Sequence, residues 1–223
     1  FFSLCLGVAV GVAVVLFLFG IRAPWALVAL ACSFAALLGV GLYFASNRKL
    51  LSVPATLAAN GVHIGLLMMI IGVAASGPYQ QKYTLELNRG GEGVAGDYHI
   101  TLNELYEGQS EPGPDGKPNY IFIEAELMVR NKAGGLIGKL SPQRRLYANF
   151  ESQSYAEVDT LFSLNNEIYA TLAGLDANNR ATVAVNVNPL VNWLWIGGAL
   201  MSLFPFGGLA RIRREEKDEG TGD

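Results

Sequence analysis

The sequence has very little of what most catalytic sites are built from. It contains only two cysteines and two histidines: Cys5, Cys32, His63 and His99. The cysteines form no CxxC or CxxCH pattern, which excludes a covalent c-type haem site and a thioredoxin-like redox motif. The sequence also has no Ser/His/Asp arrangement, no glycine-rich phosphate loop and no Cys/His cluster with metal-ligand spacing.

Charge is scarce as well. Charged residues make up 16% of the 223 positions, and the formal net charge is −3 at pH 7. With no basic cluster in the chain, we expect no nucleic-acid partner. Hydrophobic residues make up 51% of the sequence, and the mean hydropathy is +0.31. This balance is typical of a protein with both membrane and soluble parts.

The hydrophobic pattern predicts a membrane protein with four transmembrane α-helices and an exported antiparallel β-rich domain between the third and fourth helices. Runs long enough to cross a bilayer fall at about 1–21, 26–44 and 55–76, all within residues 1–79, and at 189–208. The first run has no basic segment and no A-x-A cleavage site, so we interpret it as a span rather than a signal peptide. Pro205 is expected to kink or end the fourth helix. Residues 209–223 are then a charged, solvated tail.

Residues 80–188 have a different composition. Apolar and polar residues alternate there between turn signals, which is typical of short strands. The expected strands are 82–87, 98–106, 120–129, 136–139, 155–162, 168–172 and 182–187. They suit a small antiparallel sandwich or an open barrel.

The basic residues predict an orientation. Arg48 and Lys49 follow the second span, whereas the loop before it contains only Arg22. Further basic residues follow the fourth span, namely Arg211, Arg213, Arg214 and Lys217. By the positive-inside bias, the chain is a multi-pass protein of the inner (cytoplasmic) membrane. Its tail is then cytoplasmic and its β-domain periplasmic or extracytoplasmic.

The third span carries the strongest candidate site. His63 is the one acidic or basic side chain between Lys49 and Lys82 other than the phenol of Tyr79. At about 1.5 Å rise per residue it lies near the middle of the span. A titratable group at that depth is by default a functional candidate.

The two faces of this helix differ. Gly61, Gly65 and Gly72 share one side, and small residues there favour close approach of another helix. His63 lies roughly opposite, with Asn60 about one turn towards the start of the helix, where its amide is a candidate partner of the imidazole or of a ligand held by it.

Two interpretations of His63 stay open: a hydrogen bond to a neighbouring helix, or ligation of a haem iron or another metal. One imidazole fills one axial position, and six-coordinate b-type haem needs a second ligand. The spans contain no other histidine, so that ligand would come from missing chain or from another subunit. His99 alternates with strand residues and is expected to be a surface side chain.

Two further groups are candidates for contact with an external haem or a partner. Arg144, Arg145 and Tyr147 form a local concentration of recognition groups, since arginine binds carboxylates such as haem propionates in a bidentate way. A surface salt-bridge cluster is the alternative. Trp193 and Trp195 lie near the start of the fourth span, where tryptophans are typical of a membrane-surface belt.

Several stretches together resemble one family. They are His63-Ile64-Gly65, Ile71-Gly72-Val73-Ala74 with Ser76, Pro142 to Tyr147 (PQRRLY), Glu167-Ile168-Tyr169, and Asn188 to Val191 (NPLV) followed by Trp193, Trp195, Gly197 and Gly198. In this order they resemble the carboxy-terminal part of CcmF, the haem lyase subunit of cytochrome c maturation, from about Pro54 to Gly208.

The resemblance implies a function. It makes His63 an axial ligand of a membrane-embedded b-type haem, with the second ligand on an earlier helix. It also implies receipt of haem from a haem chaperone and attachment to the CxxCH cysteines of apocytochrome c, alongside thiol-handling maturation subunits. The family's tryptophan-rich external haem segment is absent from this chain. We therefore expect it to act with an amino-terminal part or separate subunit, and not to attach haem alone.

Three alternatives remain at this point. A ResB-like cytochrome c synthesis component also combines a large exported domain with an intramembrane histidine. A membrane-anchored scaffold would use His63 only structurally. An electron-transfer b-type cytochrome would bind haem without taking part in maturation.

Overall fold

The computed structural model describes residues 2–114, 116–147 and 154–219. The chain divides into two compact units. The helical unit comprises residues 1–79 and 189–223, and the β-unit comprises residues 80–188.

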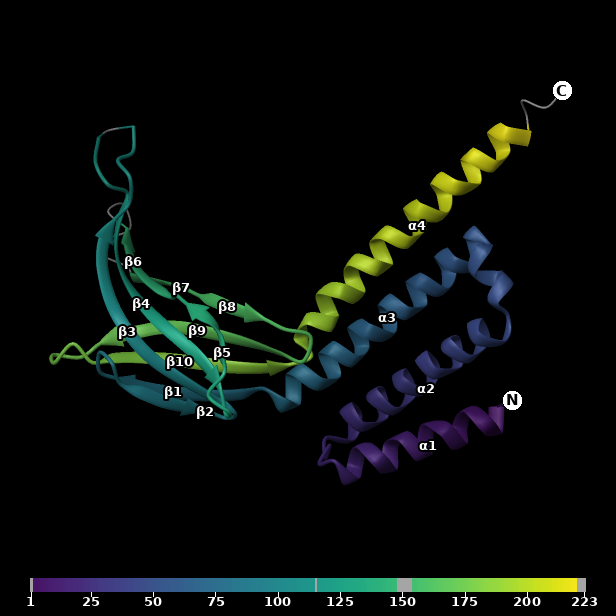
Figure 1. The fold of residues 1–223 in the computed structure, drawn as a ribbon, viewed down its shortest axis with the longest axis horizontal. Helices are drawn as coiled ribbons and strands as arrows, with labels where there is room; N and C mark the ends of the chain where they lie inside the picture. The colour runs from purple at the N-terminus through teal and green to yellow at the C-terminus, as the bar shows by residue number, and fades with distance from the viewer. Residues whose placement is uncertain (1, 115, 148–153, 220–223) are drawn as a thin grey trace. The chain divides into compact units, whose positions relative to one another are not determined.

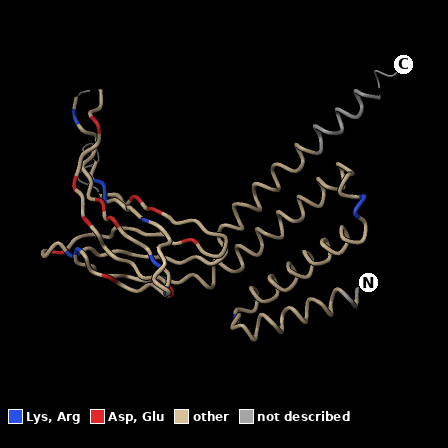
Figure 2. Tube along the Cα trace, viewed as in Figure 1, with Lys and Arg blue, Asp and Glu red and all other residues tan. Residues whose placement is uncertain are grey.

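The described residues of the helical unit form four long helices and one short 3₁₀ helix (Figure 1). They are α1 (Phe2–Leu18), α2 (Pro24–Ser46), η1 (Arg48–Ser52), α3 (Pro54–Tyr79) and α4 (Val191–Glu219). Of these, α2 and α3 are long and apolar enough to cross a membrane. The apolar parts of α1 and α4, Cys5–Leu18 and Val191–Gly207, are shorter. Figure 2 shows the basic residues of η1 between two uncharged helices.

Helix α4 does not end at Pro205. Proline lacks the N–H that would bond to the carbonyl four residues earlier, which is why the sequence suggested a kink or an end there. The helix nevertheless continues to Glu219. A single missing hydrogen bond does not stop a helix whose flanking residues still form theirs. Much of the segment expected to be a solvated tail is therefore helical backbone.

The β-unit contains more strands than the sequence pattern predicted. They are β1 (Gln81–Leu87), β2 (Glu92–Ala95), β3 (Tyr98–Gln109), β4 (Tyr120–Asn131), β5 (Leu136–Leu140), β6 (Gln143–Tyr147), β7 (Ser154–Glu157), β8 (Asp159–Phe162), β9 (Asn166–Leu175) and β10 (Ala181–Pro189). The sequence pattern missed β2 and β6. It also merged β7 and β8 into one strand.

These strands form two sheets. One has the order β1-β10-β9-β8, and the other has the order β2-β3-β4-β6-β7 with β5 also paired to β4. The expectation of an antiparallel β-rich domain is confirmed. Inward side chains of both sheets form one core, which includes Ile100, Leu127, Leu172 and Val183. The unit is thus a sandwich, because alternate residues of each strand face the same apolar layer.

The first and last strands of the β-unit are neighbours. β1 and β10 pair antiparallel from Gln81↔Val187 to Leu87↔Ala181. Just before this ladder, the Gln80 amide donates to Asn188 Oδ1 at 2.6 Å. The chain therefore enters the β-unit from α3 and leaves it towards α4 at the same end of one sheet.

Candidate functional site

The glycine face of α3 is the contact surface for α4. Gly61, Gly65 and Gly72 are buried. A Cβ atom at Gly65 would lie 2.6 Å from the carbonyl oxygen of Gly197, and one at Gly72 would lie 2.8 Å from the backbone nitrogen of Leu194. Two backbones can approach this closely only where side chains are absent. The sequence-based expectation of a close helix contact on this face is confirmed.

His63 lies on the exposed side of α3. Its Nδ1 is 2.7 Å from the carbonyl oxygen of Ala59, one turn earlier in the same helix. A carbonyl oxygen can only accept, so Nδ1 must donate the hydrogen. In the neutral ring the lone pair then belongs to Nε2. This is the arrangement in which a histidine is oriented by its backbone and presents the other nitrogen to a metal.

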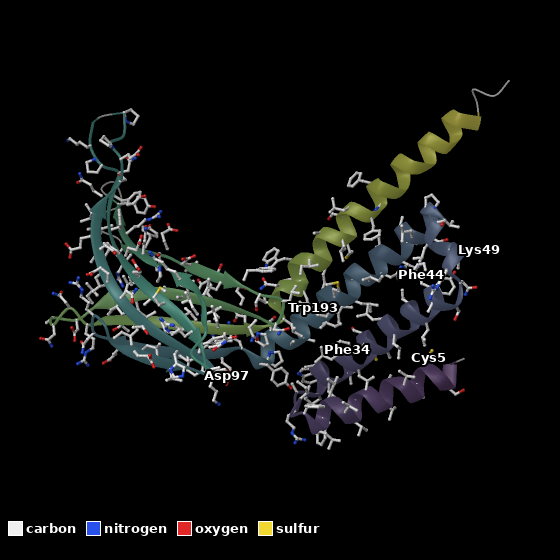
Figure 3. All side chains as sticks on the ribbon, in the orientation of Figure 1. Cys5, Phe34, Phe44, Lys49, Asp97 and Trp193 are labelled. Carbon is white, nitrogen blue, oxygen red and sulfur yellow. The ribbon has the colours of Figure 1, made fainter. Side chains whose placement is uncertain are left out.

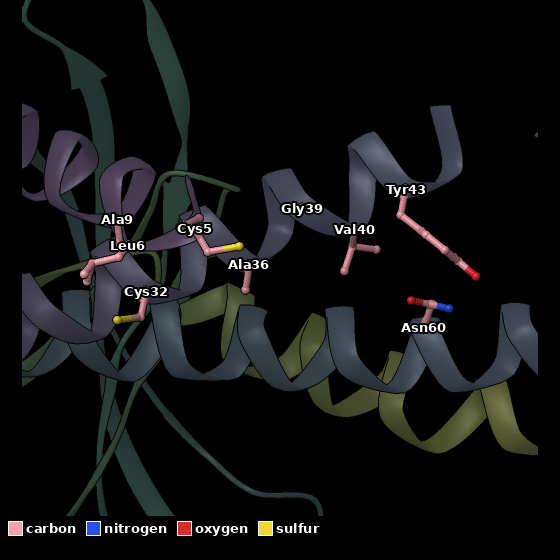
Figure 4. Close-up of a pocket in the computed structure, with 10 residues that line it drawn as sticks. Cys5, Leu6, Ala9, Cys32, Ala36, Gly39, Val40, Tyr43 and Asn60 are labelled. Atoms are coloured by element: carbon pink, nitrogen blue, oxygen red, sulfur yellow. The ribbon is translucent and has the colours of Figure 1, made fainter. Parts of the chain in front are cut away.

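Asn60 faces a different part of the helical unit. Its amide donates to the carbonyl oxygen of Thr56 at 2.8 Å. The side chain lines a groove of about 680 Å³, facing Val40 and Tyr43 of α2, and the same groove contains Cys5 of α1 and Cys32 of α2 (Figure 4). The described hydrogen bonds of Asn60 and His63 therefore go to separate backbone carbonyls, and the ring is oriented by Ala59. A sequence pattern could not show that the Ala59 carbonyl oxygen accepts the hydrogen bond from His63.

Other possible iron ligands are placed elsewhere. Met69 and Met201 pack into the α3–α4 contact, beside Gly197 and Gly65 respectively. His99 lies in β3, where its Nδ1 is 2.7 Å from Glu92 Oε1. Among the described residues, no group of three or more His, Cys, Asp or Glu side chains is arranged to hold a metal ion. Within the described helices, His63 is the only histidine.

The two arginines of β6 have different hydrogen-bond partners. Successive side chains of a strand point to opposite faces. Arg144 donates through Nε to Ser154 Oγ at 2.6 Å, while Arg145 donates to Gln143 Oε1 at 2.9 Å. Arg145 also forms an ion pair with Glu157 at 3.3 Å.

Arg145 is part of an aromatic cluster. Its guanidinium lies 4.7 Å from the ring centre of Tyr120. That ring is 5.1 Å from the ring of Tyr147, which in turn is 5.7 Å from the ring of Tyr155. Burial opposes the charge of Arg145, but the hydrogen bond with Tyr147 and the nearby Glu157 favour it, so the pKa of Arg145 is raised. Both arginines line one groove, of about 450 Å³.

Aromatic residues gather at one end of the helical unit. Trp195 is 68% exposed near the start of α4, and Trp193, labelled in Figure 3, is half-buried there. Trp25 is exposed at the start of α2. The hydroxyl of Tyr79 accepts hydrogen bonds from the backbone N–H groups of Arg22 and Ala23, at 2.8 and 3.0 Å. Tyr79 was not a candidate from the sequence, yet it fixes the α1–α2 turn to the end of α3.

Comparison with known proteins identifies the class. No family model matches the chain. The chain is 30% identical over 152 residues to the cytochrome c-type biogenesis protein CcmF of Pseudomonas aeruginosa, covering 68% of this chain and 22% of that protein. It is 26% identical over 157 residues to CcmF of Escherichia coli, covering 66% of this chain and 21% of that protein. The chain is thus similar to cytochrome c-type biogenesis proteins.

The fold points to the same family. The solved structure titled Cytochrome c Heme Lyase CcmF matches with a TM-score of 0.73 and 18% identity, over 93% of this chain and 34% of that one. The chain belongs to the CcmF family and fits the carboxy-terminal part of its members. It spans about a fifth of the length of the curated relatives it matches.

Proposed function

We propose that this chain is the carboxy-terminal part of a cytochrome c maturation haem lyase, and that His63 binds the iron of a b-type haem within the membrane. The observation that carries this proposal is the orientation of His63. Its Nδ1–H is held by the Ala59 carbonyl, and its ring is exposed on a helix without charged residues. These features fit an axial ligand, because Nε2 keeps its lone pair and is accessible.

The second axial ligand comes from outside this chain. The only other histidine is in the β-unit and pairs with Glu92. The haem would therefore lie between α3 and a helix of the amino-terminal part or of a separate subunit. Asn60, one turn from His63, would then contribute to the polar surroundings of the haem rather than to the iron. Bound haem supplies one-electron redox chemistry, and this chain's part is to hold and orient one imidazole.

The membrane arrangement follows from charge and aromatic placement. We propose four crossings of the cytoplasmic membrane by α1 to α4, with η1 and the tail on the cytoplasmic side. Arg48 and Lys49 in η1 support this orientation. Trp25, Trp195 and Tyr79 at the other ends of the helices support an interfacial belt on the extracytoplasmic side. The β-unit is then periplasmic.

The partners follow from the relatives' role in cytochrome c biogenesis. The β-unit would lie beside the haem-attachment site, where a haem chaperone delivers haem and apocytochrome c presents its CxxCH cysteines. Arg144 and Arg145 both line a groove, and both are candidates for contact with a propionate or a partner carboxylate. Arg145 also pairs with Glu157, and Tyr147 also packs on Tyr120, both within the same sheet. Trp193 and Trp195 remain candidates for contact with the external haem or a partner.

The test is a spectrum of the purified haem lyase complex that contains this chain. His63→Ala should abolish the b-type band in the reduced-minus-oxidised spectrum, whereas His99→Ala should leave it intact. In His63→Gly, added imidazole should restore the band, since the small ligand can occupy the vacated position. Rescue separates lost ligation from misfolding.

Two results would contradict the proposal. An unchanged band in His63→Ala would mean that this imidazole is structural, as in a scaffold protein. A lost band with unchanged levels of mature c-type cytochromes would indicate an electron-transfer cytochrome outside maturation.

A further inference from the structure

The most exposed apolar side chains of the β-unit gather at one end. Among its described residues, they are Phe162 (63% exposed), Leu164 (61%), Leu136 (57%) and Val94 (55%). They come from different hairpins: Val94 from β2, Leu136 from the start of β5, and Phe162 and Leu164 from the turn between β8 and β9. Large apolar side chains left exposed together on a soluble unit mark an interaction surface.

Strand register places these hairpins together. Phe162 pairs with Glu167 near the start of β9, and the preceding residue, Asn166, donates to the hydroxyl of Tyr98 at 2.9 Å. Tyr98 begins β3 and is opposite Asn131, whose strand continues through the turn to Leu136. The β2–β3, β4–β5 and β8–β9 turns therefore lie at one end of the sandwich.

This is also the end at which the chain enters and leaves the β-unit. A Cβ atom on Gly96, in the β2–β3 turn, would lie 3.0 Å from Gln81 Oε1. Gln81 begins β1 directly after α3, and its ladder partner Val187 lies near the end of β10, just before α4. The β2–β3 turn therefore lies beside the first residue of β1 and near the last residues of β10, which are the two ends of the β-unit.

The polar groups at this end are compatible with a lipid surface. Lys132, in the β4–β5 turn, is highly exposed and only loosely paired with Asp97 at 3.9 Å. Asp97, labelled in Figure 3, lies in the β2–β3 turn. Lysine beside exposed apolar residues is suited to phosphate headgroups, because its stem can lie along the acyl boundary while the ammonium stays in the headgroup layer.

We infer that these turns insert into the outer surface of the lipid bilayer. Phe162 and Leu164, the most exposed of the four apolar side chains, insert deepest. The occupant of the patch is lipid. Only Gln80 separates α3 from β1, and only Leu190 separates β10 from α4, so little chain lies between the proposed membrane-crossing helices and this end of the β-unit. The inference rests on the proposed membrane location of α3 and α4.

The test uses single-cysteine variants of the full chain in lipid nanodiscs, with Cys5 and Cys32 replaced by alanine. An environment-sensitive fluorophore is attached at Phe162→Cys or Leu164→Cys. Ile121→Cys serves as the control, since Ile121 is also exposed but pairs with Leu146 in another part of the sandwich. A fourth probe at Val73→Cys, on the exposed side of α3, reports on the span.

Nitroxide lipids labelled near the headgroup should quench the probes at 162 and 164, and the emission of both should shift to the blue. The probe at 121 should show neither effect. If the probe at 73 is quenched by lipid and those at 162 and 164 are not, this inference is overturned while the membrane proposal stands. A blue shift at 162 without lipid quenching also overturns it, because protein then covers the patch. Absence of lipid quenching at 73 contradicts the membrane location itself.

Discussion

Individual glycines decide how close α3 and α4 come. Gly65 faces Gly197 across the contact, and each would bring a Cβ atom against the other's carbonyl oxygen. By contrast, Gly77 in the same helix has open space around its Cβ position. The same substitution should therefore have different effects at the two positions.

We expect Gly65→Ala to destabilise the helical unit by roughly 1–3 kcal/mol, the usual cost of overpacking. Gly77→Ala should be close to neutral, because its Cβ position is open and the helix propensity of alanine is offset by contact with the ring of Pro78. Thermal unfolding in detergent micelles, followed by circular dichroism, measures both. Equal effects of the two variants would mean that the helices do not meet at these glycines.

Glu167 gives a second prediction at the residue scale. Burial raises the pKa of this carboxyl above its ordinary value of 4.5. The folded state therefore holds the proton more tightly than the unfolded state, and stability falls as pH rises from about 4.5 through the raised pKa.

Glu167→Gln should remove this pH dependence. At a pH above the raised pKa of Glu167, the variant should have a higher melting temperature than the parent protein. Below pH 4.5 the two melting temperatures should agree. Glu111→Gln, in an exposed loop, is the matched control and should shift the melting temperature equally at every pH. A lower melting temperature for Glu167→Gln at neutral pH would contradict the assignment.

The β9–β10 turn shows how one side chain fixes an element. Asp176 Oδ1 accepts hydrogen bonds from the backbone N–H groups of Asn178 and Arg180, both at 2.8 Å. Between them, Asn179 has a φ of 58°, a left-handed conformation that asparagine tolerates. The two backbone hydrogen bonds lower the pKa of Asp176 below 3.8.

Asp176→Ala should lower the melting temperature at neutral pH. A carboxyl with a depressed pKa stabilises the fold above its unfolded value and loses that contribution as pH falls through the folded value. The gap between variant and parent should thus narrow below about pH 3.8. Asp97→Ala, at a largely exposed position, should leave the melting curve unchanged. A gap that is constant with pH would exclude the charge of Asp176 as its cause.

Helices and strands whose apolar residues recur regularly could be predicted from the sequence. Short strands and strands rich in charged residues could not. The helices α1 to α4, the glycine face of α3 and most strands follow from hydrophobic pattern alone. β6 was missed because its sequence, QRRLY, looks like a charged loop, although the arginine side chains find partners in Ser154, Gln143 and Glu157. β2 was missed because it is short and contains Gly93. The hydrogen bond from His63 to Ala59 depends on rotamer choice, which no sequence pattern records.

At the scale of the whole molecule, the chain is much shorter than the relatives it matches. It matches relatives over about a fifth of their sequence, and it offers a single histidine in its helices. If His63 binds haem as proposed, a second axial ligand has to come from another polypeptide segment or subunit.

We predict that this chain alone, mixed with haem in detergent, gives at most the spectrum of a five-coordinate, high-spin iron. Co-expression with the amino-terminal part should convert it to a six-coordinate, low-spin spectrum. The conversion should fail with His63→Ala and persist with His99→Ala. A low-spin spectrum from the chain alone would show that the second ligand lies within residues 1–223.

The pairing of β1 with β10 has a consequence for how the protein tolerates damage. A protease cut in the connection between β3 and β4 would leave α3 on one fragment and α4 on the other. Those fragments would still share the β3–β4 and β1–β10 ladders and the glycine contact of the helices. A nicked molecule would therefore migrate as two bands on a denaturing gel yet elute as a single particle in detergent, and the two halves could be supplied from separate genes.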